Sequence, residues 1–191
     1  MIVGLVLAAG SGSRLGMPKA LVELHGERLV DRAVRTLRAG GCADITVVLG
    51  AAEVEVPGAT VVHNPDWATG MGSSLRVGLA ALPDDAGAVV ISLVDQPQIG
   101  PDVVARLIAA HVAGAAVAVA TYAGKRRNPA LFARSTWADA AATAVGDQGA
   151  RGYFSAHPET VTAVPCDDLG DPVDIDTPAD LARFTDEKGA E

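Results

Sequence analysis

The chain opens on an apolar run that passes directly into a glycine-rich loop: Ile2-Val3-Gly4-Leu5-Val6-Leu7-Ala8-Ala9-Gly10-Ser11-Gly12-Ser13-Arg14-Leu15-Gly16-Met17-Pro18-Lys19. The run at 2–8 has the length of a strand, and its nearly unbroken hydrophobicity is typical of a strand buried on both faces. Strands of this kind lie in parallel sheets between two layers of helices, and such sheets bind ligands at the carboxyl ends of their strands. The loop after this strand is therefore the first place to look for a binding site.

Strand-like and helix-like segments alternate along the rest of the chain. Further strands are expected at 45–49, 60–62, 88–94, 115–121, 130–132, 160–164 and 173–175. Helices are expected at 29–38, 73–82, 101–111, 136–144 and 178–184, with a short helix after a turn at 146–149. This alternation predicts an α/β protein with three layers, α/β/α, around a mostly parallel twisted sheet. The sequence shows no internal repeat and no low-complexity linker, so a single domain is expected to span residues 1–191.

Composition and charge narrow the classes of function. Hydrophobic residues make up 49% of the 191 residues and charged residues 20%, which excludes a disordered chain. The net charge is −8, yet residues 1–40 carry six Lys/Arg against three Asp/Glu. Because a nucleic-acid partner requires a broad basic face, we expect none, whereas a small anion fits the basic N-terminal part. No apolar run resembles a leader peptide or a membrane span, so we expect a cytoplasmic protein without a membrane partner.

The loop after the first strand has the chemistry of an anion site. Its glycines and serines offer unobstructed backbone N–H groups, and Arg14 and Lys19 add two positive charges. No glycine satisfies the P-loop spacing GxxxxGK[ST]. The dinucleotide spacing GxGxxG also fails, because Leu15 follows Gly10 and Gly12 where the third glycine belongs.

Two carboxylates stand where other predicted strands end. Asp95 follows the apolar run 89–94, and Asp176 lies within the stretch 174–178. Carboxylates from separate strand ends can share one Mg²⁺ ion, whose other ligands would be water and phosphate oxygens. Each carboxylate also has a structural interpretation, as a cap for the helix that follows it. Cys42 and Cys166 lack metal-ligand spacing and are interpreted as buried thiols, and Trp67 and Trp137 as packing residues.

These motifs resemble those of the molybdenum cofactor nucleotidyltransferases, the MobA-like NTP transferases, and especially their cytidylyltransferase branch. The similar segments are 7–19, 64–74, 95–97, 146–151 and 174–178, which occur in family order. The resemblance implies the Rossmann-like nucleotidyltransferase fold, also called the nucleotide-diphospho-sugar transferase fold. It further implies transfer of a nucleoside monophosphate from an NTP to a phosphorylated acceptor, with release of pyrophosphate.

The resemblance also assigns roles to individual residues. It implies catalytic roles for Arg14, Lys19 and Asp95, and a Mg²⁺ site formed by Asp95 and Asp176. The nucleotide would be bound by Leu7, Ala8, Ala9, Gly10, Ser11, Gly12, Ser13, Arg14, Lys19, Gly70, Ser73 and Ser74. Ala9 favours CTP, because guanylyl-transferring relatives usually carry glycine there. The acceptor would meet Arg127, Asn128 and Pro129, where the cytidylyltransferases usually have Gly-His-Pro, and this departure weakens the assignment of molybdopterin as the acceptor.

Other functions remain open on the sequence. A GTP-dependent guanylyltransferase and a transferase with another acceptor, such as a sugar phosphate, would share these motifs. A nicotinamide-dependent oxidoreductase on a similar scaffold is disfavoured by the failed GxGxxG spacing. A non-catalytic, nucleotide-binding chaperone for a molybdoenzyme is disfavoured because both Asp95 and Asp176 are present. A transient molybdoenzyme partner is compatible with each of the cofactor-related functions.

Overall fold

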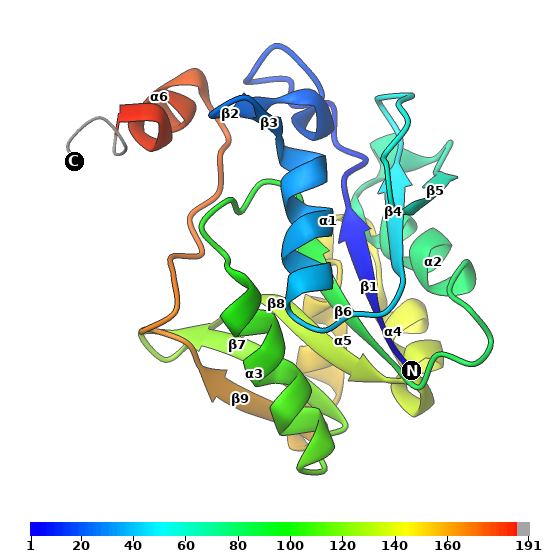
Figure 1. The fold of residues 1–191 in the computed structure, drawn as a ribbon. Helices are drawn as coiled ribbons and strands as arrows, with labels where there is room; N and C mark the ends of the chain where they lie inside the picture. The colour runs from blue at the N-terminus through cyan, green and yellow to red at the C-terminus, as the bar shows by residue number, and fades with distance from the viewer. Residues whose placement is uncertain (187–191) are drawn as a thin grey trace.

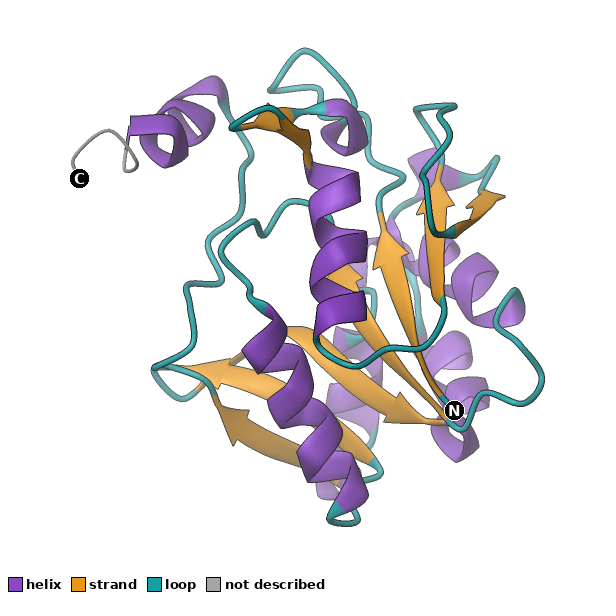
Figure 2. Cartoon of the chain, in the orientation of Figure 1, coloured by secondary structure: helices purple, strands orange, loops and turns teal. Residues whose placement is uncertain are grey.

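A computed structural model describes residues 1–186 as three layers, with helices on both faces of a seven-stranded sheet (Figures 1 and 2). The strand order is β5-β4-β1-β6-β8-β7-β9. The strands are β1 (Ile2–Leu7), β4 (Ile45–Leu49), β5 (Thr60–His63), β6 (Ala88–Leu93), β7 (Val117–Tyr122), β8 (Lys125–Ala133) and β9 (Val161–Pro165). A separate two-stranded ribbon pairs β2 (Glu23–Leu24) with β3 (Glu27–Arg28).

The helices are α1 (Leu29–Ala39), α2 (Met71–Ala80), α3 (Pro101–Val112), α4 (Trp137–Thr143), α5 (Arg151–Ala156) and α6 (Pro178–Asp186). Short 3₁₀ helices lie at Lys19–Leu21, Trp67–Thr69, Arg134–Thr136, Gly146–Gln148 and Pro158–Thr160. No helix within residues 1–186 is long and apolar enough to cross a membrane. The last five residues of the expected domain, 187–191, lie outside the described part of the chain.

The pairing of the strands confirms the mostly parallel sheet. β1 pairs in parallel with β4 and β6, β4 with β5, and β7 with β9. Only β8 runs against its neighbours β6 and β7, among the seven strands of the described sheet. The carboxyl ends of β1, β4 and β6 therefore meet at one edge of the sheet, which is where the sequence predicts the site.

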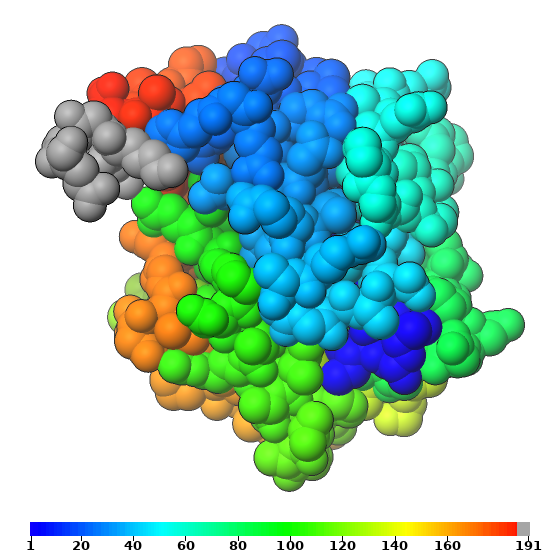
Figure 3. Space-filling view, in the orientation of Figure 1, coloured from blue at the N-terminus to red at the C-terminus, as the bar shows by residue number. Residues whose placement is uncertain are grey.

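Alternate residues of each strand pack into two separate hydrophobic cores, one on each face of the sheet. In β1, Val6 belongs to the core beneath α1 and α3, whereas Leu5 belongs to the core beneath α2, α4 and α5. The space-filling view shows α1 and α3 side by side over one face of the molecule (Figure 3). A strand with two buried faces needs apolar residues at every position, which is the pattern that identified β1 from the sequence.

Two predicted strands differ from the structure. Residues 173–175 form no strand: Ile175 N donates one backbone hydrogen bond to Asp95 O (2.8 Å), and Pro172 has no N–H group to extend a ladder. The segment instead crosses the carboxyl end of β6 on its way to α6. The short strand expected at 130–132 is the buried end of the longer β8, whose first residues are exposed and charged.

Cys42 and Cys166 are both buried free thiols, as expected. Burial raises the pKa of Cys42 to about 12, so this thiol stays protonated at neutral pH. Trp137 is also a packing residue, with its ring buried and its indole N–H donated to Phe132 O (3.1 Å). None of these three side chains takes part in the site described next.

Candidate functional site

Two adjoining cavities lie at the carboxyl ends of β1 and β6. The smaller has a volume of about 290 Å³ and is lined by Ala9, Gly10, Ser11, Lys19 and Asp95, together with residues at the start of α2. The larger has a volume of about 620 Å³ and lies toward the β7–β8 hairpin. Leu7, Met71 and Leu93 line both cavities, so the two cavities are adjacent.

Lys19 joins the two predicted metal-binding carboxylates beside the smaller cavity. Its ammonium group donates hydrogen bonds to Asp95 Oδ2 and to Asp176 Oδ1, the latter at 2.6 Å. The Arg14 guanidinium lies 3.3 Å from the same oxygen of Asp176. The structure thus brings together Arg14, Lys19, Asp95 and Asp176, which we call the carboxylate–cation cluster.

The charges of this cluster stabilise one another. Burial by itself would lower the pKa of Lys19, but Asp95 and Asp176 outweigh burial and the pKa is raised. The hydrogen bond from Lys19 lowers the pKa of Asp176. Lys19 and Asp176 are therefore ionised at neutral pH, and the site presents fixed charges of both signs.

Neither carboxylate is used as a helix cap. Helix α3 has Gly100 as its N-cap residue, with no side-chain cap from Asp95. At the start of α6, Thr177 N donates to Asp180 Oδ2 (2.9 Å) and Asp180 N donates to Thr177 Oγ1 (3.2 Å). This reciprocal capping leaves the Asp176 carboxylate free to meet Lys19. The expectation that Asp176 follows a strand is wrong, since the segment before it forms none.

The cluster fits a divalent cation. Asp95 Oδ1 is buried and has no hydrogen-bond partner among residues 1–186, so it is an unused acceptor beside Asp95 Oδ2 and Asp176 Oδ1. Within residues 1–186 no group of three or more His, Cys, Asp or Glu side chains could enclose a metal. Two carboxylates, completed by water and phosphate oxygens, are a typical Mg²⁺ donor set.

The glycine loop has a fixed shape. Gly12 has a φ of +58°, and a Cβ there would lie 2.0 Å from Met17 O, so only glycine fits. Gly12 O accepts hydrogen bonds from Leu15 N (2.8 Å) and Gly16 N (2.9 Å). Gly10, in contrast, faces open space, since a Cβ there would have no atom beyond its chain neighbours within 4 Å. The loop therefore presents Gly10 to the cavity and uses Gly12 to hold its turn.

The start of α2 forms the opposite wall of the smaller cavity. Gly70 has a φ of +117°, and a Cβ there would lie 2.5 Å from the Gly146 carbonyl carbon. Asn64 Nδ2 donates to Ser73 Oγ (2.8 Å) and Ser74 Oγ (3.0 Å). Ser74 lines the cavity, while Ser73 donates its hydroxyl to loop carbonyls. Trp67, interpreted from the sequence as a packing residue, also lines this cavity.

Not every predicted nucleotide-binding residue faces the smaller cavity. Leu7, Ala9, Gly10, Ser11, Lys19, Gly70 and Ser74 line it. Ala8 is buried in the core on the other side of the sheet, and Gly12, Ser13 and Ser73 lie outside the lining. Arg14 is mostly exposed and reaches the site through Asp176.

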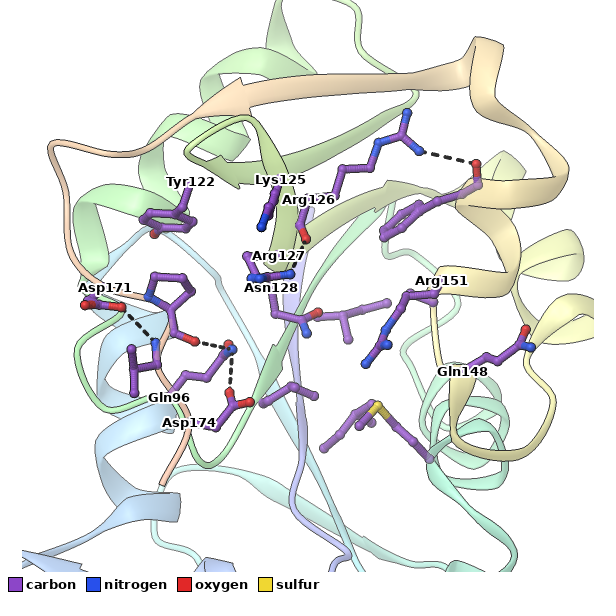
Figure 4. Close-up of a pocket in the computed structure, with 18 of the residues that line it drawn as sticks. Gln96, Tyr122, Lys125, Arg126, Arg127, Asn128, Gln148, Arg151, Asp171 and Asp174 are labelled. Carbon is purple, nitrogen blue, oxygen red and sulfur yellow. Dashed lines mark hydrogen bonds between the residues drawn. The ribbon is translucent and has the colours of Figure 1, made fainter. Parts of the chain in front are cut away.

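The larger cavity contains two of the three predicted acceptor-binding residues, Arg127 and Asn128, but not Pro129 (Figure 4). Sequence reasoning missed several other lining residues: Gln96, Tyr122, Lys125, Arg126, Gln148, Arg151, Asp171 and Asp174. Gln96, Asp174 and Arg151 lie within the motifs 95–97, 174–178 and 146–151, so their position beside the predicted site residues could have identified them. Tyr122 and Asp171 carry no such signal, because only the fold brings them to this cavity.

Gln96 ties the segment before α6 to the carboxyl end of β6. Its side-chain amide donates to Asp174 Oδ1 (2.8 Å) and to Pro172 O (3.1 Å) (Figure 4). Burial and the neighbouring Asp95 raise the pKa of Asp174, although Gln96 partly offsets them. This link fixes one wall of the larger cavity and brings Asp176 within reach of Lys19.

Comparison with known protein families identifies the family of this chain. The model of the MobA-like NTP transferase domain matches residues 4–161, and the chain belongs to this family. A structure of molybdopterin-guanine dinucleotide biosynthesis protein A from Archaeoglobus fulgidus shares the fold, with a TM-score of 0.69 at 20% identity over the full length of both chains. Family membership supports nucleotidyl transfer as the class of reaction.

Individual relatives differ in function. The chain is 34% identical to nicotine blue oxidoreductase of Paenarthrobacter nicotinovorans over 197 aligned residues, which cover 96% of each protein. It is 41% identical over 115 residues to the bifunctional IPC transferase and DIPP synthase of Rubrobacter xylanophilus. That match covers 54% of the chain and 26% of the longer relative, so the chain spans about a quarter of that protein.

Solved structures of mycobacterial proteins are similar over nearly the whole chain. A homologue of Mycobacterium tuberculosis Rv0371c from Mycobacterium sp. strain JC1 has a TM-score of 0.85 at 32% identity, covering 97% of this chain and 96% of its own. Rv0371c of M. tuberculosis H37Rv in complex with manganese has a TM-score of 0.77 at 29% identity, covering 97% and 98%. The manganese complex agrees with divalent-metal dependence in this family.

Proposed function

We propose that this cytoplasmic, single-domain protein transfers the nucleoside monophosphate of an NTP, preferentially CTP, to a phosphorylated acceptor and releases pyrophosphate. The proposed acceptor is molybdopterin or the molybdenum cofactor. The observation that carries the proposal is the carboxylate–cation cluster beside the glycine loop, where Lys19 lies between Asp95 and Asp176. The second cavity next to it supplies room for an acceptor.

The residues of the smaller cavity suit a nucleotide. The backbone N–H groups of the loop, with Arg14 and Lys19, would hold the triphosphate by charge-assisted hydrogen bonds. Asp95 and Asp176 would hold Mg²⁺, which when bound offsets negative charge on the phosphates. Because the Lys19 ammonium lies between these carboxylates, it would have to move for both of them to hold a metal.

The proposed reaction needs no protein base. An acceptor monophosphate has a second pKa of about 6 and is mostly ionised at neutral pH. Its oxygen would attack the α-phosphorus of the NTP, forming a new P–O bond as the bond to pyrophosphate breaks in line. No histidine in the described chain lines either cavity, which agrees with this scheme. Catalysis would then come from positioning and from stabilisation of charge by Lys19 and Arg14.

The test is pyrophosphate release with each of the four NTPs against a panel of acceptors in the presence of Mg²⁺. The panel contains molybdopterin, the molybdenum cofactor and several sugar phosphates. We expect release with CTP and the molybdopterin acceptors, and its loss in Asp95→Asn. Preference for GTP would favour a guanylyltransferase, and release with a sugar phosphate would reassign the acceptor. Nucleotide binding without release in any combination would favour a non-catalytic chaperone of a molybdoenzyme.

A second candidate function is suggested by the near full-length similarity to nicotine blue oxidoreductase. In that case the two cavities would hold a nicotinamide cofactor and an oxidised substrate. The loop at Gly10–Gly16 lacks the dinucleotide fingerprint, which disfavours this function. Titration with NADH and NADPH distinguishes the two candidates: saturable binding of either cofactor, together with no pyrophosphate release, would favour the oxidoreductase.

A further inference from the structure

One wall of the larger cavity is strongly cationic. Lys125, Arg126, Arg127 and Arg151 line it, and none of them forms an ion pair with a described acidic residue. Eight other cationic side chains do form such pairs: Arg14, Lys19, Arg28, Arg32, Arg35, Arg106, Arg134 and Arg183. The chain has 23 acidic and 15 basic residues, so the lack of ion pairs at these four cations does not come from a shortage of acidic side chains.

One of these cations, Arg127, lies in an irregularity of the sheet. In the β7–β8 ladder, Val119 pairs with Ala130 and Thr121 pairs with Arg126. One residue of β7 therefore faces three residues of β8, 127–129, which bulge out of the ladder. Arg126 is braced from the other side, where its guanidinium lies 6.0 Å from the centre of the Phe154 ring. Arg151 is the first residue of α5.

The other walls of the cavity have a different character. Met71, Ile91, Leu93 and Phe154 supply apolar surface, and Asp171 and Asp174 lie across the cavity from Arg151 (Figure 4). Both acids already accept hydrogen bonds, Asp174 from Gln96 and Asp171 from Val173 N. The volume of about 620 Å³ suits a small organic molecule with an apolar body. Four cations against two acids favour an anionic group on the cationic wall.

The cationic wall is separate from the place of reaction. The reacting phosphate must reach the carboxylate–cation cluster, and none of the four wall cations lines the smaller cavity. We propose that the acceptor carries a second anionic group in addition to the phosphate that reacts, and that Lys125, Arg126, Arg127 and Arg151 bind this second group. The inference rests on the proposed function and narrows its acceptor to molecules with two anionic groups joined by a partly apolar body.

A matched pair of ligands tests the inference without nucleotide or metal. Phenyl phosphate has one anionic group, and 4-carboxyphenyl phosphate has the same body with a second. Isothermal titration should show that the unmodified protein binds the carboxylated ligand about tenfold more tightly, as expected for one added charge-assisted contact. The preference should shrink as salt is raised.

Variants show whether the cationic wall causes this preference. The double variant Arg127→Gln/Arg151→Gln should bind both ligands with nearly equal affinity. Arg38→Gln is the control, because Arg38 lies on α1, outside the cavity, forms no ion pair with a described residue and also carries a single positive charge. Far-UV circular dichroism and thermal melting would establish that all variants fold.

Three outcomes would overturn the inference: equal affinity for both ligands in the unmodified protein, no binding of the carboxylated ligand at millimolar concentration, or an undiminished preference in the double variant. Failure of the proposed function gives a different result. In that case pyrophosphate release is absent with every NTP, while the preference for the doubly anionic ligand and its dependence on Arg127 and Arg151 persist.

Discussion

At the scale of single residues, Lys19 is the central side chain of the candidate site, because it contacts both of its carboxylates. It starts a 3₁₀ helix at the end of the glycine loop, and its partly buried ammonium group connects two carboxylates that are distant in sequence. Its presence in the loop was evident from the sequence, as were Asp95 and Asp176. The contact among the three was not, because it depends on the path of the segment before α6.

Replacement of Lys19 tests the binding of the triphosphate. Loss of one charge-assisted contact, worth about 1.5–3 kcal/mol, should weaken CTP binding roughly ten- to a hundredfold in Lys19→Met and nearly abolish turnover. Isothermal titration with CTP and Mg²⁺ measures the loss, and circular dichroism checks the fold. Unchanged CTP affinity would contradict the assignment of the loop to the triphosphate.

The same substitution should have the opposite effect on the metal. In the absence of nucleotide, the Lys19 ammonium competes with a divalent cation for Asp95 and Asp176. Lys19→Met should therefore bind Mn²⁺ about tenfold more tightly than the unmodified protein, as followed by electron paramagnetic resonance of free Mn²⁺. Addition of Asp95→Asn should remove the gain. Weaker Mn²⁺ binding in Lys19→Met would mean that the two carboxylates do not form the metal site.

Ala9 tests the choice of base. It lines the smaller cavity, and under the proposed function its methyl group would take up space that a purine base needs. We predict that the unmodified protein prefers CTP to GTP and that Ala9→Gly reduces the preference, by the ~1–3 kcal/mol typical of one carbon atom. Turnover of both nucleotides at equal concentration measures the ratio. Preference of the unmodified protein for GTP would refute the steric argument.

At the scale of elements, the sequence predicts best the strands that are buried along nearly their whole length. β1 and β6 are buried on both faces, so their apolar runs identified them. β8 was predicted only over its buried end, because the exposed Lys125-Arg126-Arg127 part does not resemble a strand. Val173 and Ile175 are β-branched residues typical of a strand, but the segment crosses the end of the sheet, and no local pattern distinguishes these two paths.

The start of α6 determines where Asp176 lies, and its capping is sensitive to pH. Hydrogen bonds from the Thr177 hydroxyl and from the backbone N–H groups of Asp176 and Thr177 lower the pKa of Asp180. A lowered pKa means that ionised Asp180 stabilises the fold above its ordinary pKa of about 4, and that this contribution is lost as the pH falls below that value.

We therefore predict that Asp180→Ala lowers the melting temperature at pH 7 and that the difference shrinks as the pH falls through about 4 toward 3. Differential scanning fluorimetry across this range measures it. Asp186→Ala, at the opposite end of α6, is the control and should show no such pH-dependent loss. A difference in melting temperature that stays constant from pH 7 to pH 3 would refute the capping role of the carboxylate.

At the scale of the whole molecule, both cavities are formed by residues from several elements of the same sheet and the helices that cover it. The smaller cavity takes residues from β1, β6 and α2, and the larger adds the β7–β8 hairpin and the residues around α5. The arrangement of layers followed from the alternation of strands and helices in the sequence. The cationic wall did not, since a bulge in β8 and the packing of the short helix α5 bring residues 125–127 and Arg151 to one cavity, and the sequence reveals neither.

Unfolding tests whether the chain behaves as the single domain that we propose. The two cores share the same strands: Leu5 and Val6 are neighbours in β1 but pack on opposite faces, so loss of one core exposes the other. Trp67 lies near the carboxyl end of β4 and Trp137 at the start of α4, which places them in different parts of the molecule.

In the single-tryptophan variants Trp67→Phe and Trp137→Phe, the urea midpoint from fluorescence should equal the midpoint from far-UV circular dichroism of the same variant. Each variant serves as its own reference, so a change in stability from the substitution itself does not disturb the comparison. A tryptophan signal that changes at clearly lower urea than the circular dichroism would show that its part of the sheet unfolds independently, and the chain would then contain two cooperative units.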